Sequence, residues 1–314
     1  MSLEIIDSQA IVAMLSLADW PLNERARVQG VLADIDDTLT SEGRITDEAL
    51  AALHALKAAG LLVVLVTGRP AGWSKPFAAS WPVHAIVAEN GALALLRGAS
   101  SPGGRGSQGE RSEPGLEAVR TLYQQDAATR AANYARMQQV AARILREVAG
   151  AKLAQDSAGR ETDIAVDHSE FTHLAPEGID QVLRVMRSEG MNASVSSIHI
   201  NGWFGAHDKL SGARWILREL FARDLDAELP RWSYIGDSTN DQVMFRHLPH
   251  SVGVANIQRF AKDLQFPPRY VCTQARGAGF AEFAAALLAA RTEAANAGAN
   301  AAFAPGQNGA KGGA

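Results

Sequence analysis

Three largely apolar runs in the first third of the chain constrain its fold most strongly. The runs span residues 28–36, 61–68 and 84–96. Between the first two, residues 46–60 place leucines at helical spacing, with Thr46 positioned to cap the helix and Gly60 to end it. Strands that are apolar on both faces and are joined by a helix are typical of a parallel sheet covered on both sides. We therefore expect an α/β fold.

The middle of the chain follows a different pattern. Residues 161–168 and 192–204 alternate between apolar and polar side chains, as strands do when one face is wet. Helical spacing is found in residues 116–149 and 176–190. These segments together predict an antiparallel α+β module that is inserted into the first fold.

The last third returns to the first pattern, so the parallel sheet is expected to be discontinuous in sequence. Helices are expected at 209–221 and 277–295, and strands near 231–236 and 250–256. The expected organisation is an N-terminal extension (1–27), a Rossmann-like parallel-sheet core (28–92 and 205–290), an inserted domain (93–204) that begins with a Gly/Ser-rich loop (98–115), and a disordered tail (291–314).

Composition narrows the function classes. The 314 residues include 30 basic and 34 acidic side chains, for a formal charge of -4, so there is no basic field suited to nucleic acid. Cys272 is the single cysteine, the N-terminus lacks the basic region of a signal peptide, and no window of eighteen apolar residues predicts a membrane span. We expect a cytoplasmic protein with no membrane partner, and the oligomeric state stays open.

Acidic residues gather where the predicted strands end. Asp34, Asp36 and Asp37 follow the first strand, and Asp237 follows a later one. Ligand sites in open α/β sheets lie at the carboxyl ends of the strands, so these carboxylates should meet, together with Lys209. Carboxylate oxygens in such a group favour a hard divalent cation such as Mg²⁺.

Two carboxylates of this group, Asp34 and Asp36, can divide the chemistry of phosphoryl transfer. Asp34, kept ionised by a cation, can attack phosphorus, while Asp36 can give a proton to the leaving oxygen. Lys209 would offset charge, and the Thr67 hydroxyl with nearby backbone amides would hold the phosphoryl oxygens. Asp37 is interpreted as a turn residue.

Four short motifs in this order resemble the haloacid dehalogenase superfamily. They are "DIDDT" (34–38), "VTGR" (66–69), the lysine of "HDKLSGA" (207–213) and "GDSTND" (236–241). An insertion of about 110 residues between the second and third motifs is similar to the C2-type cap, and the form of the last motif is similar to subclass IIB, which includes Cof-type and sugar-phosphate phosphatases.

The resemblance implies roles for individual residues. Asp34 would be the nucleophile that forms an aspartyl-phosphate, and Asp36 the general acid/base. Mg²⁺ would be held by the Asp34 carboxylate, the Asp36 backbone carbonyl and Asp237. Phosphate contacts would come from Thr67, Gly68, Lys209 and Asn240, with Asp241 orienting Lys209 or a metal-bound water. Arg69 could contact substrate or be solvated, and this choice stays open.

Specificity is expected to reside in the inserted domain. His199, Asn201 and Trp203 are the candidates, because planar hydrogen-bonding groups beside an aromatic face suit a sugar, although all three could be ordinary sheet residues. The sequence thus predicts a Mg²⁺-dependent phosphomonoesterase for a small phosphate ester such as a sugar phosphate. A phosphomutase and a non-catalytic sugar-phosphate-binding regulator are the alternatives.

Overall fold

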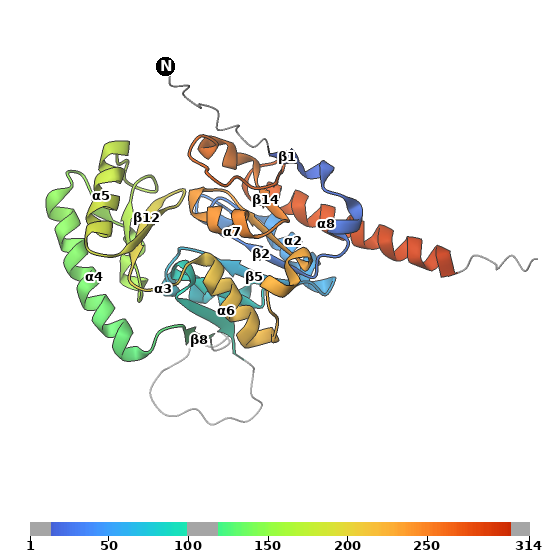
Figure 1. Ribbon diagram of the computed structural model, residues 1–314, viewed down its shortest axis with the longest axis horizontal. Coiled ribbons are helices and arrows are strands. Elements are labelled where there is room, and N and C mark those ends of the chain that lie inside the picture. Colours follow the sequence, from blue (N-terminus) through green and yellow to red (C-terminus); the bar gives the residue numbers. More distant parts are fainter. Residues whose placement is uncertain (1–13, 99–118, 303–314) are drawn as a thin grey trace, which may run out of the picture.

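A large mixed sheet forms the centre of the molecule (Figure 1). The computed structural model describes residues 14–98 and 119–302, and within them nine strands pair in the order β1-β15-β14-β13-β2-β5-β6-β7-β8. Pairing is parallel from β1 through to β6, and antiparallel for β6 with β7 and for β7 with β8. The strands are β1 (Leu15–Ser16), β2 (Gly30–Ala33), β5 (Leu62–Val66), β6 (Ala85–Ala88), β7 (Leu93–Arg97), β8 (Val119–Tyr123), β13 (Trp232–Gly236), β14 (Ser251–Gly253) and β15 (Tyr270–Val271).

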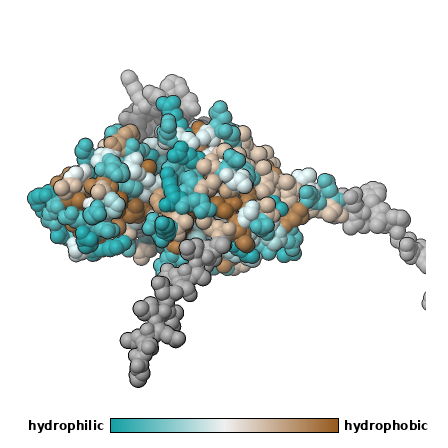
Figure 2. Space-filling view, turned by 90° about the horizontal axis from the view of Figure 1, so that it is seen from above, coloured by the Kyte–Doolittle hydropathy of each residue, from teal (hydrophilic) through white to brown (hydrophobic). Residues whose placement is uncertain are grey.

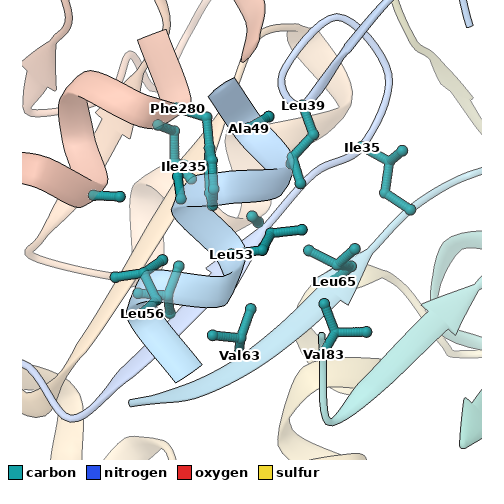
Figure 3. Packing of buried hydrophobic residues seen from close by; sticks show 14 of the residues in the cluster. Ile35, Leu39, Ala49, Leu53, Leu56, Val63, Leu65, Val83, Ile235 and Phe280 are labelled. Atoms are coloured by element: carbon teal, nitrogen blue, oxygen red, sulfur yellow. The ribbon is translucent and has the colours of Figure 1, made fainter. Parts of the chain in front are cut away.

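Helices cover both faces of this sheet, as the apolar runs predict. Val31 faces the layer formed by α2 (Asp47–Ala58), α3 (Ala71–Ser80) and α8 (Arg276–Ala302), and its neighbour Leu32 faces α6 (Lys209–Phe221) and α7 (Gln242–His247). Figure 3 shows the first layer, where Leu53 of α2 lies over Val63 of β5. The predicted cap of α2 is confirmed, because the Thr46 hydroxyl accepts the Ala49 N–H at 3.3 Å.

A second, smaller sheet forms the cap domain, on the left in Figure 1. Its order is β11-β12-β10-β9, all antiparallel. The elements are β9 (Lys152–Leu153), β10 (Ile164–Asp167), β11 (Asn192–Val195), β12 (His199–Trp203), α4 (Ala127–Glu147) and α5 (Pro176–Ser188). Val166 and Ile200 pack with α4 and α5 in a separate apolar cluster. The alternate residues of β12, among them His199 and Asn201, therefore lie on the other face of the sheet, toward the core.

The border between core and cap differs from the expected position at residue 93. A turn at Glu89–Gly91, with φ of +54° at Asn90, reverses the chain, so that β7 and then β8 extend the large sheet. The helix expected over 116–149 begins only at Ala127, because residues 119–123 pair with β7. Sequence spacing alone could not show this edge pairing.

Both ends of the chain depart from the expected plan. The N-terminal extension contributes β1, which pairs with β15 at one edge of the sheet, and α1 (Leu22–Arg25). At the other end, α8 continues to Ala302, so residues 291–302 are helical rather than a disordered tail. Nearly all of the Gly/Ser-rich loop and the end of the tail lie outside the described residues.

Short elements complete the structure. A hairpin of β3 (Thr40–Ser41) and β4 (Arg44–Ile45) follows the first aspartates. The 3-10 helices are η1 (Leu17–Asp19), η2 (Glu89–Gly91), η3 (Gln155–Gly159), η4 (Asp226–Arg231), η5 (Thr239–Asp241) and η6 (Ala255–Phe260). Among the described residues, no helix combines the length and apolarity needed to cross a bilayer. The face drawn in Figure 2 intersperses hydrophilic and hydrophobic residues.

Candidate active site

The carboxyl ends of β2 and β13 and the start of α6 bring four charged side chains together. Lys209 Nζ donates to Asp34 Oδ1 at 2.6 Å and to Asp241 Oδ1 at 2.7 Å. One oxygen each of Asp34, Asp237 and Asp241 lies within 4.8 Å of the others. All four side chains are buried. We call Asp34, Lys209, Asp237 and Asp241 the aspartate–lysine cluster.

Local capping places Lys209 in this cluster. Asp208 caps α6, with its carboxylate accepting the Ser211 N–H at 2.7 Å and its own N–H donating to Ser211 Oγ. Lys209 is therefore the first residue of the helix, and its side chain extends inward toward the strand ends. Because Asp34 lies 175 residues earlier in the chain, only the sheet topology brings the pair together.

Asp241 is fixed from several sides. Its Oδ2 accepts the backbone N–H groups of Asp237 and Ser238 at 2.9 and 3.0 Å, and its Oδ1 accepts the Tyr234 hydroxyl. A Cβ on Gly236 would lie 2.5 Å from this carboxylate, so the position needs glycine. Asp241 thus orients Lys209, which is one of the two roles considered for it from sequence.

The two carboxylate oxygens of Asp237 differ in their hydrogen bonding. Its Oδ2 accepts from Asn256 Nδ2 and from Arg259, each at 3.1 Å. Its Oδ1 finds no hydrogen-bond donor among the described residues, although the side chain is fully buried. An unpartnered buried carboxylate oxygen is costly, and a cation is the partner that would remove the cost.

The charges of the aspartate–lysine cluster fit a divalent metal ion. Three carboxylates face one ammonium group, and burial raises the pKa of Asp237 and raises that of Asp34 to about 7, with Lys209 opposing the shift at Asp34. A hard cation with oxygen ligands would compensate these charges, and the donor set suits Mg²⁺. The residues present therefore fit the metal expected from sequence.

Asp36 is held by a buried arginine. Arg69 Nε lies 3.0 Å from both carboxylate oxygens of Asp36, and its terminal nitrogens contact Asp156 at 3.2 Å and Glu170 at 2.7 Å, both in the cap. Only 4% of Arg69 is exposed, so it is not a solvated side chain. Arg69 connects the end of β5 to the cap and sets the orientation of Asp36.

The other residues expected to hold phosphate lie around the same strand ends. The Thr67 oxygen accepts the Arg69 N–H at 3.0 Å, which leaves the hydroxyl proton available for donation. The Gly68 carbonyl accepts from Arg160 of the cap at 3.0 Å. Asn240 Oδ1 lies 3.4 Å from Lys209 Nζ and, like Gly68, lines the same small cavity as Asp34.

The cap is closed over the aspartates. The cavity between them and the loop at 196–198 is about 10 Å³, room for about one water molecule. His199 and Asn201 line it, as their expected role requires, and the structure places them beside Asp34 and Asp36. Trp203 does not join them: at the far end of β12, its indole N–H donates to the His207 carbonyl at 2.8 Å.

A network of buried charges joins the cap to the core. Arg160 pairs with Asp163 at 2.8 Å and with Asp156 at 3.0 Å, and Arg69 pairs with Asp156 and Glu170. We call these five residues the arginine seam. His199 Nε2 extends it, 2.8 Å from Glu170 Oε2. Arg69 pairing and the hydrogen bond to His199 lower the pKa of Glu170 to about 2, although burial opposes this.

Some residues of the site escaped the sequence analysis. Ser197 and Ile198 line the cavity from the cap loop before β12, and Asn256 and Arg259 contact Asp237 from η6. Serines and an isoleucine next to His199 carry no distinctive chemistry. Asn256 could have been found from the sequence, because it follows the buried strand β14, whose carboxyl end reaches the same sheet edge.

Comparison with known proteins agrees with this geometry. Residues 31–100, which contain the first two motifs, match the family described as haloacid dehalogenase-like hydrolase. This part of the chain is thus similar to the haloacid dehalogenase-like hydrolases. No curated protein matches the sequence.

Solved structures share the fold of this chain over most of its length. A Thermoplasma acidophilum protein is 17% identical, with a TM-score of 0.59 over 83% of this chain and 98% of its own. A HAD/COF-like hydrolase from Plasmodium vivax is 14% identical (TM-score 0.59, 86% and 99% covered). Sucrose-phosphatase from Synechocystis sp. PCC6803, solved with sucrose and phosphate, is 15% identical (TM-score 0.54, 83% and 98% covered).

Proposed function

We propose that this chain is a Mg²⁺-dependent phosphatase that hydrolyses a small phosphorylated metabolite, a sugar phosphate, through a phosphorylated aspartate. One observation carries the proposal. The carboxylate of Asp34 contacts Lys209 and lies beside the unpartnered oxygen of Asp237, at a cavity that Asp36 also lines. A nucleophile, a cation site and a proton carrier therefore meet at one point.

Asp34 is the nucleophile in this proposal. An oxygen of its carboxylate attacks phosphorus, the bond from phosphorus to the leaving oxygen breaks, and an acyl phosphate forms on Asp34. Lys209 stays within hydrogen-bond reach of this carboxylate and offsets the negative charge of the transferring group. Thr67 and Asn240 donate to phosphoryl oxygens.

Asp36 moves the protons. In the first half of the reaction it gives a proton to the leaving alcohol oxygen, and in the second half it takes one from the water that attacks the acyl phosphate. The contact with Arg69 keeps its carboxylate turned to the cavity. A halide leaving group would need no such proton.

Mg²⁺ would be held by Asp34, Asp237 and the backbone carbonyl of Asp36, and when bound it supplies positive charge for the phosphoryl oxygens. The cap supplies the remaining requirement, the exclusion of water. Since the closed cavity holds about 10 Å³, the cap must lift to admit an ester and close again before Asp34 is phosphorylated.

The substrate class rests on the inserted cap and on similar folds. The sucrose-phosphatase that shares this fold was solved with a sugar and phosphate, which supports a sugar phosphate here. His199 and Asn201 offer planar hydrogen-bonding groups at the cavity, as such a substrate needs. Trp203 is not part of this proposal, because its side chain is bound within the connection to α6.

A phosphate-release assay tests the proposal. Purified protein is incubated with sugar phosphates, nucleotides and acetyl phosphate, with Mg²⁺ or with EDTA. We expect Mg²⁺-dependent release that Asp34→Asn abolishes, whereas Asp263→Asn, an exposed aspartate elsewhere on the core, retains it. Phosphate released in proportion to substrate consumed excludes a phosphomutase. Absence of turnover on the whole panel would favour the non-catalytic binding protein.

A further inference from the structure

The side chain of Asn256, in η6, connects three separate segments beside the aspartate–lysine cluster. Its Nδ2 donates to the Asp37 carbonyl at 3.0 Å and to Asp237 Oδ2 at 3.1 Å. Its Oδ1 accepts the backbone N–H of Arg276, the first residue of α8, at 2.9 Å. A carbonyl can only accept and a backbone N–H can only donate, so these partners fix which way the amide of Asn256 points.

Asn256 is itself attached to packed parts of the core. In the segment that follows β14, the Val254 N–H donates to the Gly236 carbonyl at 3.1 Å. The next N–H, that of Ala255, donates to the Gln274 carbonyl at 2.9 Å. The helix α8, whose first N–H Asn256 accepts, packs in the first helical layer of the large sheet. The amide therefore extends from a rigid support, as a group that orients others requires.

The first segment that Asn256 holds is the turn after β2. Asp37 lies in this turn with a φ of +53°, a conformation that residues other than glycine rarely adopt. Its N–H donates to Thr40 Oγ1 at 3.2 Å, and its carboxylate pairs with Arg259 at 2.8 Å. The residue before Asp37 is Asp36, whose backbone carbonyl is one of the proposed Mg²⁺ ligands. By binding the Asp37 carbonyl, Asn256 anchors the turn that carries this ligand.

The second segment is the end of β13. Asp237 Oδ2 accepts from Asn256 and from Arg259, each at 3.1 Å, whereas Oδ1 has no donor among the described residues. Because both donors reach the same oxygen, the other oxygen remains available to a cation. Hydrogen bonds of this kind orient carboxylates that bind metals, and they fix which oxygen does so.

Arg259 and Asn256 contact the same oxygen of Asp237 but differ in charge. The Nη2 of Arg259 lies 2.8 Å from Asp37 Oδ2 and 3.1 Å from Asp237 Oδ2. Its guanidinium would repel a cation bound at Asp237, so Arg259 holds the carboxylate and at the same time opposes the metal. Asn256 is neutral. Its contribution to cation affinity is therefore positioning alone.

We propose that Asn256 is a positioning residue of the metal site. It ties the turn after β2 to the end of β13, and so holds the Asp36 carbonyl and the Asp237 carboxylate at a fixed separation for one Mg²⁺ ion. This inference rests on the proposed function only for the identity of the metal ligands. Removing the amide frees both segments, so cation binding weakens while the packed helices retain the fold.

Two substitutions of Asn256 separate positioning from charge. Asn256→Ala removes all three hydrogen bonds, and its dissociation constant for Mg²⁺ should rise roughly 10- to 100-fold. Asn256→Asp keeps the size of the side chain, adds a negative charge and removes the two donations. The added charge by itself would tighten Mg²⁺ binding, whereas we expect the loss of positioning to weaken it about tenfold. Tighter binding in Asn256→Asp, or an unchanged constant in Asn256→Ala, would overturn the proposal.

Calorimetric titration of Mg²⁺ alone into the purified full chain measures these constants without substrate. The matched control is Asn192→Ala, which removes an exposed cap asparagine that also donates to a backbone carbonyl, and it should bind Mg²⁺ as the wild type does. Urea unfolding in EDTA shows whether each variant is folded, and the isosteric Asn256→Asp decides the test if Asn256→Ala is not. A lower free energy of unfolding with a wild-type dissociation constant would make Asn256 a purely structural residue and overturn the proposal.

These outcomes are distinguishable from failure of the proposed function. Weaker Mg²⁺ binding in both Asn256 variants supports the positioning role even if no ester is hydrolysed, a result that would defeat only the phosphatase. Mg²⁺-dependent phosphate release from acetyl phosphate, with wild-type affinity in both variants, would defeat only the positioning role. Wild-type protein that binds no Mg²⁺ would overturn the positioning role whatever the release assay gives.

Discussion

The aspartate–lysine cluster and the arginine seam are both buried and charged, yet only the seam is complete in itself. In the seam, Arg69 and Arg160 each meet at least two carboxylates, and every seam carboxylate has a guanidinium partner. In the cluster, Asp34 and Asp241 share one ammonium. Asp237 pairs with Arg259 through one oxygen, and its Oδ1 has no donor in the described part of the chain. Breaking a fully paired buried network is strongly destabilising, whereas an unpartnered buried carboxylate oxygen is costly unless a ligand such as a cation pairs with it.

The largest effect is expected from Lys209→Met, which removes the only cation of the cluster. Turnover should fall by roughly 10⁴-fold or more, because removing one of several catalytic groups that act as a unit costs nearly as much as removing all of them. Stability should also fall, since buried carboxylates lose their partner, and added Mg²⁺ should restore part of that loss. Phosphate release and urea unfolding with and without Mg²⁺ measure both. A free energy of unfolding that does not change when Mg²⁺ is added would contradict a cation site at the cluster.

Arg160→Met breaks the seam instead. Asp163 and Asp156 lose a buried partner, so the free energy of unfolding should fall by about 3–5 kcal/mol, and Mg²⁺ should not restore it. Urea denaturation measures the change. The control is Arg143→Met, whose ion pairs with Glu147 and Glu189 are partly exposed and should contribute under about 1 kcal/mol. If Arg160→Met and Arg143→Met lost similar amounts of unfolding free energy, the seam would contribute no more to stability than a surface ion pair.

The connection between the two regions should be sensitive to acid. His207 lies between β12 and α6, and burial lowers its pKa to about 4 from an ordinary 6.5. As pH falls, this histidine is therefore protonated in the unfolded chain before it is protonated in the folded one. The resulting contribution to stability, about 3 kcal/mol, is present above pH 6.5 and is lost as pH falls toward 4. Unfolding measured across this window should show the loss, and His207→Phe should flatten it. An unchanged slope would rule out His207 as the source.

The smallest effect is a thermal shift on adding metal. At a Mg²⁺ concentration of 100 times Kd, the folded protein should gain about 2.7 kcal/mol, and Tm should rise accordingly. Asp237→Asn should lose this rise because the unpartnered oxygen becomes part of an amide. Asp263→Asn should keep it. A shift of equal size in Asp237→Asn would place the metal elsewhere.

Much of the aspartate–lysine cluster could be predicted because its evidence is local. Asp34 and Asp36 follow an apolar run directly, and the run predicts a strand whose carboxyl end opens a parallel sheet. The same rule applies to Asp237, so carboxylates from two segments far apart in sequence could be assigned to one edge. Lys209 could be expected at this edge because it begins a predicted helix of the core, and the resemblance to a known motif order supports its role.

The contacts by which the arginine seam joins cap and core could not be predicted, because Arg69 and its partners are distant in sequence and have no common pattern. Only Arg160 has local partners, at i,i+3 and i,i+4 spacing. Arg69 meets carboxylates 87 and 101 residues away, at positions that read as ordinary surface acids. Likewise, β8 is an edge strand that exists only because β7 is available to pair with it. Contacts of this kind depend on the relative placement of two domains.

By itself, the sequence determined which groups could meet: apolar strands that end in carboxylates at one sheet edge gather the oxygen ligands that a hard cation prefers. It also determined that the strand with His199 and Asn201 turns these residues to one side, since side chains alternate along a strand. Only the tertiary structure decided which of the side chains on that face of the strand line the cavity. His199 and Asn201 lie at the cavity and Trp203 lies at the connection to α6, because no local pattern encodes how the cap packs against the core.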